Sequence, residues 1–167
     1  QNDPQFFIPV HFNRLLGFAM PDPLRVLFVC TGNTCRSPMA EAMFRAAAGK
    51  LPVEVRSAGV SAGAGSSATR ETVEVLRKRG IELDGHRSAM VEEDLLEEAD
   101  HVFCMTRGHL EMLEMMYPEF RDRFHLVRDF DSVERGEDVP DPIGMGREAY
   151  EEVAECFETA LAGILEF

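Results

Sequence analysis

The sequence has few cysteines and no dense disulfide pattern. It contains four cysteines in 167 residues, and only Cys30 and Cys35 lie close together. Small secreted domains depend on many disulfides, and zinc sites usually show two short Cys/His pairs, so neither class fits. Cys104 and Cys156 stand alone on apolar stretches and are expected to be small core residues. This use of cysteine favours a reducing, cytoplasmic location.

Long hydrophobic runs and an excess of positive charge are also missing. No stretch approaches ~18 uninterrupted apolar residues, so the sequence predicts no transmembrane helix. Lys and Arg number 17 against 30 Asp and Glu, which gives a formal net charge of −13. Nucleic-acid binding usually needs a basic surface. We therefore expect neither a membrane nor a nucleic acid among the partners.

Residues 1–23 look different from the rest of the chain. The segment from Phe6 to Met20 is rich in apolar residues but interrupted by Pro9 and Arg14, and it lacks the basic start of a signal peptide. We interpret residues 1–23 as an N-terminal extension or leader of unknown role. Residues 24–167 are expected to form one domain, since 45% hydrophobic and 28% charged residues are ordinary for a globular protein.

Short apolar runs alternate with helical patterns along this domain. Strands are predicted at 24–29, 53–57, 101–105 and 124–127, and helices at 38–49, 69–79, 92–98, 108–117 and 147–165. This alternation predicts an α/β fold: a four-stranded parallel sheet with helices on both faces, of Rossmann-like type. Ligands of such sheets bind beyond the carboxyl ends of the strands, which is where the loop after Val29 lies.

The loop after Val29 contains the candidate catalytic and anion-binding residues. It reads Cys30-Thr31-Gly32-Asn33-Thr34-Cys35-Arg36-Ser37, between an apolar strand and a helix start at Ser37-Pro38. A tight loop that feeds a helix directs backbone N–H groups and the helix dipole at an anion. Gly32 permits a tight turn, Asn33 tolerates a left-handed backbone, and Arg36 offers a planar fork of donors. The pattern predicts a phosphate cradle with a nucleophilic Cys30 thiolate, to which Ser37 can donate a hydrogen bond.

A leaving group needs a proton, and a carboxylic acid can supply it. Four aspartates fall in the long stretch before the last helix: Asp129, Asp131, Asp138 and Asp141. Spacing alone does not choose among them.

At these residues the sequence resembles the low-molecular-weight protein tyrosine phosphatase family. The similarity runs from Val29 through Glu41, and continues at Ser57-Ala58-Gly59, Gly80-Ile81, His86, Ala99-Asp100, Met105-Thr106 and Asp141-Pro142. It implies a metal-free protein phosphatase without a cofactor, acting on phosphorylated proteins. Cys30 would form a phosphocysteine, Arg36 would bind phosphoryl oxygens, and Asp141 would be the general acid.

The resemblance also implies a supporting network and a specificity position. Asn33, Ser37, Ser57 and His86 match the hydrogen-bond network under the loop, and Cys35 matches a second loop cysteine that can pair with the nucleophile on oxidation. Tyrosine-specific members usually carry Ile or Leu at the position of Thr34, whereas bacterial protein-arginine phosphatases carry Thr. Aromatic residues usually follow Asp-Pro in tyrosine-specific members. Ile143 stands there instead, and it also departs from the Phe that is usual in the arginine-specific branch.

Phosphoarginine on proteins is therefore the favoured substrate, with phosphotyrosine as the alternative. Arsenate reductases share this loop and fold, but they pass a disulfide to further cysteines, and the region from His101 to Tyr117 offers only Cys104. A non-catalytic phosphate-binding module is a third hypothesis, which would leave Cys30 and Asp141 dispensable. The sequence does not indicate an oligomeric state.

Overall fold

The computed structural model describes residues 22–167, so the predicted extension lies almost wholly outside the described residues. Its strands are β1 (Leu24–Cys30), β2 (Val53–Gly59), β3 (His101–Cys104) and β4 (Phe124–Leu126). All pairs are parallel, in the order β2-β1-β3-β4. The helices are α2 (Arg36–Ala48), α3 (Arg70–Lys78), α4 (Glu93–Glu98), α5 (Arg107–Met116) and α6 (Arg147–Glu166).

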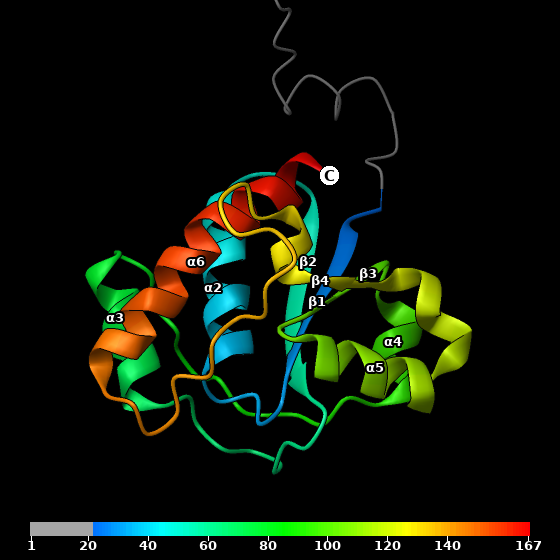
Figure 1. The fold of residues 1–167 in the computed structure, drawn as a ribbon, viewed down its shortest axis with the longest axis horizontal. Coiled ribbons are helices and arrows are strands. Elements are labelled where there is room, and N and C mark those ends of the chain that lie inside the picture. Colours follow the sequence, from blue (N-terminus) through cyan, green and yellow to red (C-terminus); the bar gives the residue numbers. More distant parts are fainter. Residues whose placement is uncertain (1–21) are drawn as a thin grey trace, which may run out of the picture.

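Both faces of the sheet are covered by helices. In Figure 1, α2, α3 and α6 lie on one side of the strands, while α4 and α5 lie on the other. Strand side chains alternate between faces, so β1 sends Phe28 into the core beneath α2 and α6, and Val29 into the core beneath α4 and α5. Both residues are fully buried. The predicted α/β fold with a four-stranded parallel sheet is confirmed.

Two local features differ from the predicted elements. The segments Pro118–Arg123 and Val127–Phe130 form short 3₁₀ helices, η1 and η2, on either side of β4. The first helix begins at Arg36, earlier than the predicted Ser37 cap, and Cys35 occupies the N-cap position without a side-chain bond. Ser37 therefore lies inside the first turn, and its hydroxyl is free to serve the preceding loop instead of the helix end.

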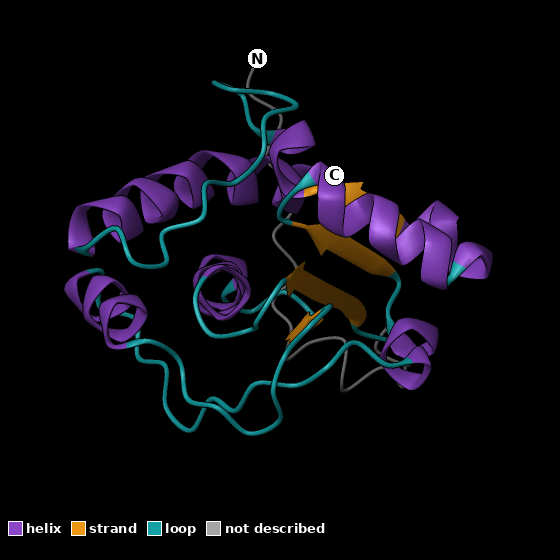
Figure 2. Cartoon of the chain, turned by 60° about the horizontal axis from the view of Figure 1, so that its bottom comes forward, coloured by secondary structure: helices purple, strands orange, loops and turns teal. Residues whose placement is uncertain are grey.

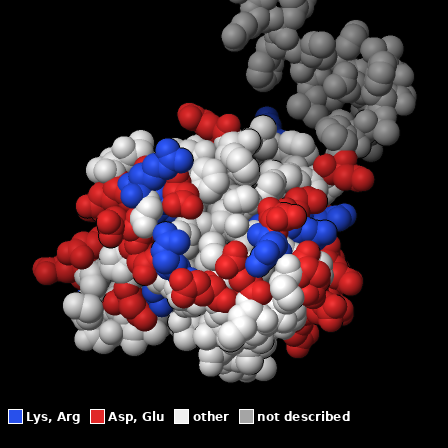
Figure 3. Space-filling model, turned by 45° about the vertical axis from the view of Figure 1, so that its right-hand side comes forward, with Lys and Arg blue, Asp and Glu red and all other residues white. Residues whose placement is uncertain are grey.

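The carboxyl ends of β1 and β2 lie at the lower end of the molecule in Figure 1, where the connections that follow these strands run. Figure 2 turns this end forward and shows the loops crossing it. The surface of the molecule also carries many charged side chains. On the face in Figure 3, acidic side chains gather with basic side chains lying among them. Within residues 22–167, no helix is long and apolar enough to span a bilayer.

Candidate active site

The loop between β1 and α2 has its carbonyl groups held on the outside. Four of them accept hydrogen bonds from beyond the loop: Cys30 from the Val60 N–H (2.9 Å), Thr31 from the Ser61 N–H (2.9 Å), Asn33 from His86 Nε2 (2.7 Å) and Thr34 from the Thr69 N–H (2.9 Å). The N–H of a trans peptide points opposite to its carbonyl. The N–H groups that follow these carbonyls therefore point inward, which forms a cradle for an anion.

Asn33 holds the loop in a strained conformation. Its φ is 53°, and it is the one residue other than glycine with positive φ in the described chain. The side chain is fully buried and satisfied: Nδ2 donates to Ser37 Oγ and Ser57 Oγ, each at 2.9 Å, and Oδ1 accepts the Ala89 N–H at 2.9 Å. The structure thus brings together the network expected at Asn33, Ser37, Ser57 and His86, with His86 donating to the Asn33 carbonyl.

The end of β2 packs directly on this loop. A Cβ at Gly59 would overlap the carbonyl oxygen of Thr31 and lie 3.0 Å from the Asn33 nitrogen. Only glycine allows the strand this close, so the outward Thr31 carbonyl can reach the Ser61 N–H. Two residues before Gly59, the Ser57 hydroxyl donates to the Glu41 carboxylate at 2.6 Å, and Glu41 pairs with Arg45 at 2.5 Å. Glu41 anchors the network from α2.

The Cys30 thiol lies at the base of the cradle. It is 3% exposed, with Sγ 3.0 Å from Ser37 Oγ and 3.3 Å from the Asn33 nitrogen, whose N–H donates to it. Because the Ser37 hydroxyl accepts from Asn33, its own proton is free for either the sulfur or the Ala58 carbonyl at 3.3 Å. Both groups near the sulfur are donors that favour negative charge on it.

Arg36 joins the loop to the long connection before α6. The residue is 4% exposed, and its guanidinium donates to Asp141 Oδ2 at 3.0 Å and to the Val139 carbonyl at 3.3 Å. Two of the other aspartates have different partners: Asp131 pairs with Arg128 at 3.1 Å, and Asp138 accepts the Arg107 N–H at 2.7 Å. Asp129 is exposed. Among the four candidates, Asp141 is the one that contacts the cradle.

The remaining cysteines differ in their surroundings. Cys35 is buried, with Sγ 3.4 Å from the Tyr150 hydroxyl of α6 and 3.7 Å from Thr34 Oγ1. Burial raises the pKa of the Cys104 thiol, and it raises the pKa of Cys156 to about 11. Neither of those two thiols supplies a thiolate at neutral pH. Cys104 is a core residue as predicted, whereas Cys156 is half-buried.

The expected specificity residues are Thr34, in the loop, and Ile143, two positions after Asp141. Thr34 is half-buried, and its carbonyl is tied to the start of α3. Ile143 is 59% exposed, with its N–H donating to Asp141 Oδ1 at 3.2 Å. Ile143 therefore does not form a closed wall, although its backbone helps to orient the carboxylate of Asp141. In residues 22–167, no three His, Cys, Asp or Glu side chains cluster in a way that could hold a metal ion.

Comparison with known proteins identifies the family of the chain. The family described as low molecular weight phosphotyrosine protein phosphatase matches residues 25–166. The chain belongs to this family. It is a cysteine-dependent protein phosphatase, which confirms the resemblance drawn from the loop motif.

Relatives of this low molecular weight phosphatase carry two substrate names. A protein-arginine-phosphatase of Geobacillus stearothermophilus is 42% identical over 145 residues, covering 86% of this chain and 95% of the relative. A low molecular weight protein-tyrosine-phosphatase of Streptomyces coelicolor is 41% identical over 151 residues, covering 84% and 91%. The solved structure of the YwlE arginine phosphatase from Geobacillus stearothermophilus has a TM-score of 0.79 at 42% identity, covering 86% and 92%.

Sequence reasoning missed three polar residues around the phosphatase loop. Glu41 was noted only as part of a motif, Tyr150 lies within an apolar helical pattern, and His109 lies in a Met/Leu-rich helix. Each is placed at the loop by tertiary packing, from α2, α6 and α5 respectively. A polar residue on an otherwise apolar helix face was the one available signal for Tyr150 and His109.

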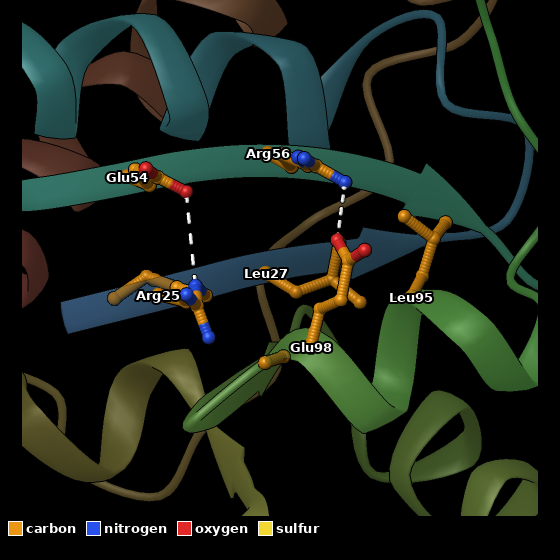
Figure 4. A pocket seen from close by; sticks show the side chains of 8 residues that line it. Arg25, Leu27, Glu54, Arg56, Leu95 and Glu98 are labelled. Carbon is orange, nitrogen blue, oxygen red and sulfur yellow. Dashed lines mark hydrogen bonds and ion pairs between the residues drawn. The ribbon is translucent and has the colours of Figure 1, made fainter. Parts of the chain in front are cut away.

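One hollow of the phosphatase lies away from the loop. Figure 4 shows it between β1, β2 and α4, with Arg25, Leu27 and Leu95 among the residues that line it. Two ion pairs cross it, Arg25–Glu54 at 3.8 Å and Arg56–Glu98 at 2.8 Å. All four charged side chains are about half exposed, so these pairs contribute little to stability. The hollow flanks the amino-terminal half of β1, away from Cys30.

The buried histidine at the phosphatase loop makes stability depend on pH. Burial first, and then the positive charge of Arg36, lower the pKa of His109 to about 4, from an ordinary 6.5. Protonation therefore favours the unfolded chain: the contribution of neutral His109 is complete above pH 6.5 and is lost as pH falls toward 4. We expect this residue to reduce the free energy of unfolding by roughly 3 kcal/mol across that range.

Urea unfolding of the wild type and of His109→Gln at pH 7 and pH 4.5 measures this contribution. The variant should lose less stability than the wild type between the two pH values, because the carboxylates common to both proteins titrate alike. Equal losses in the two proteins would contradict the assignment of this pH dependence to His109.

Proposed function

We propose that this phosphatase hydrolyses phosphoarginine on proteins through a phosphocysteine intermediate. The observation that carries the chemistry is the Cys30 thiol at the base of a cradle of inward N–H groups, with Arg36 and Asp141 at its mouth. The observation that favours arginine is the hydroxyl-bearing Thr34 at the loop edge, beside an open Ile143. The name of the Geobacillus relative points the same way.

In the first step the Cys30 thiolate attacks phosphorus. An S–P bond forms while the P–N bond to the guanidino group breaks, and protonated Asp141 gives its proton to the leaving nitrogen. The inward N–H groups and the Arg36 fork bind the phosphoryl oxygens as charge develops on them. Since Arg36 now donates to Asp141, substrate binding is expected to redirect the Arg36 donors and free the Asp141 carboxyl for proton transfer.

In the second step water attacks phosphorus from the side that the guanidino group has left. Asp141 takes a proton from this water, the S–P bond breaks, and inorganic phosphate is released. The Ser37 hydroxyl at 3.0 Å then donates to the departing thiolate, which regenerates the enzyme. Because the chemistry requires a reduced Cys30, we also propose that the protein is located in a reducing cytoplasm. We further propose that residues 24–167 form the phosphatase domain.

Phosphotyrosine is the second candidate substrate. The family description and the Streptomyces relative favour it, and the two steps are the same with a phenol oxygen as leaving atom. A phenol ring gains affinity by stacking on aromatic side chains. The residues after Asp141, Pro142-Ile143-Gly144, offer no aromatic ring, so the loop supplies less to hold a phenol.

Thr34→Ile is the variant that tests the preference. Matched peptides carrying phosphoarginine or phosphotyrosine at one position are compared by phosphate release. We expect the wild type to prefer phosphoarginine by about tenfold or more in kcat/KM, and Thr34→Ile to shift the ratio about tenfold toward phosphotyrosine, because the hydroxyl that would bind the guanidino group is lost.

Thr34→Ser is the matched control, since it keeps the hydroxyl and should keep the preference. A wild type that strongly prefers phosphotyrosine would make the protein a tyrosine phosphatase with an open pocket wall. An unchanged ratio in Thr34→Ile would remove Thr34 as the specificity determinant.

A further inference from the structure

His109 is a buried histidine with both ring nitrogens bonded to threonine hydroxyls. Nε2 lies 2.8 Å from Thr31 Oγ1 and Nδ1 lies 2.9 Å from Thr106 Oγ1. The side chain is 7% exposed, on the first turn of α5. Thr31 directly follows Cys30, so the imidazole reaches the phosphate loop from the side opposite to α3.

The hydrogen bonds around Thr106 indicate where the ring proton lies. A neutral imidazole has one donor nitrogen and one acceptor nitrogen. Thr106 caps α5, and its Oγ1 already accepts the backbone N–H of His109 at 3.2 Å. The hydroxyl proton of Thr106 is available for Nδ1, and this arrangement favours the tautomer with the ring proton on Nε2, directed at Thr31 Oγ1. Thr31 then accepts this bond, and its own hydroxyl proton is free to be donated elsewhere.

Thr31 is placed to use that proton. Its backbone is fixed, because its carbonyl accepts the Ser61 N–H and Gly59 packs against it. Its side chain is exposed beside the cradle, so without a partner its hydroxyl would be free to turn toward water. The bond from His109 selects one orientation of this hydroxyl in the unliganded enzyme.

We propose that His109 is a positioning residue of the phosphatase reaction, which holds the Thr31 hydroxyl ready to donate to the phosphoryl group bound over Cys30. This inference rests on the proposed reaction at Cys30. It adds a donor to the inward N–H groups and Arg36, and it explains why a buried polar side chain occupies an otherwise Met/Leu-rich helix at this position. His109 acts through Thr31 and does not itself touch the substrate.

The test is a double-mutant cycle with p-nitrophenyl phosphate, which reports turnover whichever protein substrate the enzyme prefers. His109→Leu and Thr31→Val are each expected to lower kcat/KM about tenfold, the effect of one lost hydrogen bond. Because both variants remove the same donor, the double variant should be no worse than the worse single variant, within about twofold.

Two further variants separate positioning from folding. His109→Gln places an amide nitrogen near the position of Nε2 and should stay within about threefold of wild type. His109→Asn places its amide near Nδ1, keeps the contact to Thr106, and should lose activity as His109→Leu does. Thermal unfolding of each protein checks that it is folded, and if His109→Leu does not fold, the comparison of Gln with Asn decides.

The outcomes are distinct. A wild type that turns over, with additive effects of His109→Leu and Thr31→Val, overturns the inference and leaves the proposed function standing. Equal activity of the Gln and Asn variants also overturns it, since the role would then run through Thr106. A wild type with no turnover removes the proposed function and this inference with it.

Discussion

Replacing Cys30 with serine is expected to lower the rate of phosphate release by at least about 10⁴-fold. Serine keeps the size of the side chain and its bond to Ser37, but its hydroxyl is not ionised at neutral pH. The cradle itself consists of backbone N–H groups and Arg36, which the substitution leaves in place. Cys30→Ser should therefore still bind inorganic phosphate, measured by calorimetry, while losing turnover.

Cys156→Ser is the matched control for this variant. Cys156 is a half-buried thiol of α6 with a pKa raised to about 11, so its removal should leave turnover unchanged. Thiol alkylation should likewise inactivate the wild type, and inorganic phosphate should protect against it. Turnover by Cys30→Ser near the wild-type rate would exclude the thiol as nucleophile.

Asp141→Asn is expected to show the second largest loss, about 10²- to 10⁴-fold in kcat. Asparagine keeps the shape of the side chain and can still accept the bond from Arg36, but it has no acidic proton to give. The loss should be smallest for substrates with good leaving groups, which depart without protonation, and largest for poor ones. A series of aryl phosphates with phenols of graded acidity measures this dependence.

Asp138→Asn is the control from the same connection. Asp138 accepts the Arg107 N–H at the start of α5, and asparagine can accept it too, so kcat should stay within about threefold of wild type. If Asp141→Asn responded to leaving-group acidity as the wild type does, Asp141 would not be the general acid.

Much of the fold was predictable because its causes are local. The run Leu24 to Val29 is apolar and rich in β-formers, and Pro38 and Gly49 bracket a segment of strong helix formers. The cradle was predictable for the same reason, since a glycine, an asparagine and an arginine within eight residues have a direct steric and electrostatic meaning. The helix start was wrong by two residues because the loop, and not a capping hydroxyl, sets where α2 begins.

The long-range parts of the site could not be derived from spacing. Arg36 meets Asp141 across 105 positions, so spacing left four aspartates open, and only the resemblance singled one out. His109 reaches Thr31 across 78 positions, from a helix whose sequence indicates core packing. The 3₁₀ helices beside β4 have no strong periodicity, because runs of four to six residues are too short to show one.

The covalent intermediate on Cys30 is the centre of this account, and trapping it is the most direct test. Enzyme is mixed with ³²P-labelled aryl phosphate, quenched within the first turnovers, digested, and its labelled peptides are sequenced by mass spectrometry. We expect the label on the peptide that contains Cys30, attached to the cysteine sulfur, and we expect no such cysteine-linked label in Cys30→Ser. A label on another residue, or full turnover without any labelled peptide, would contradict it.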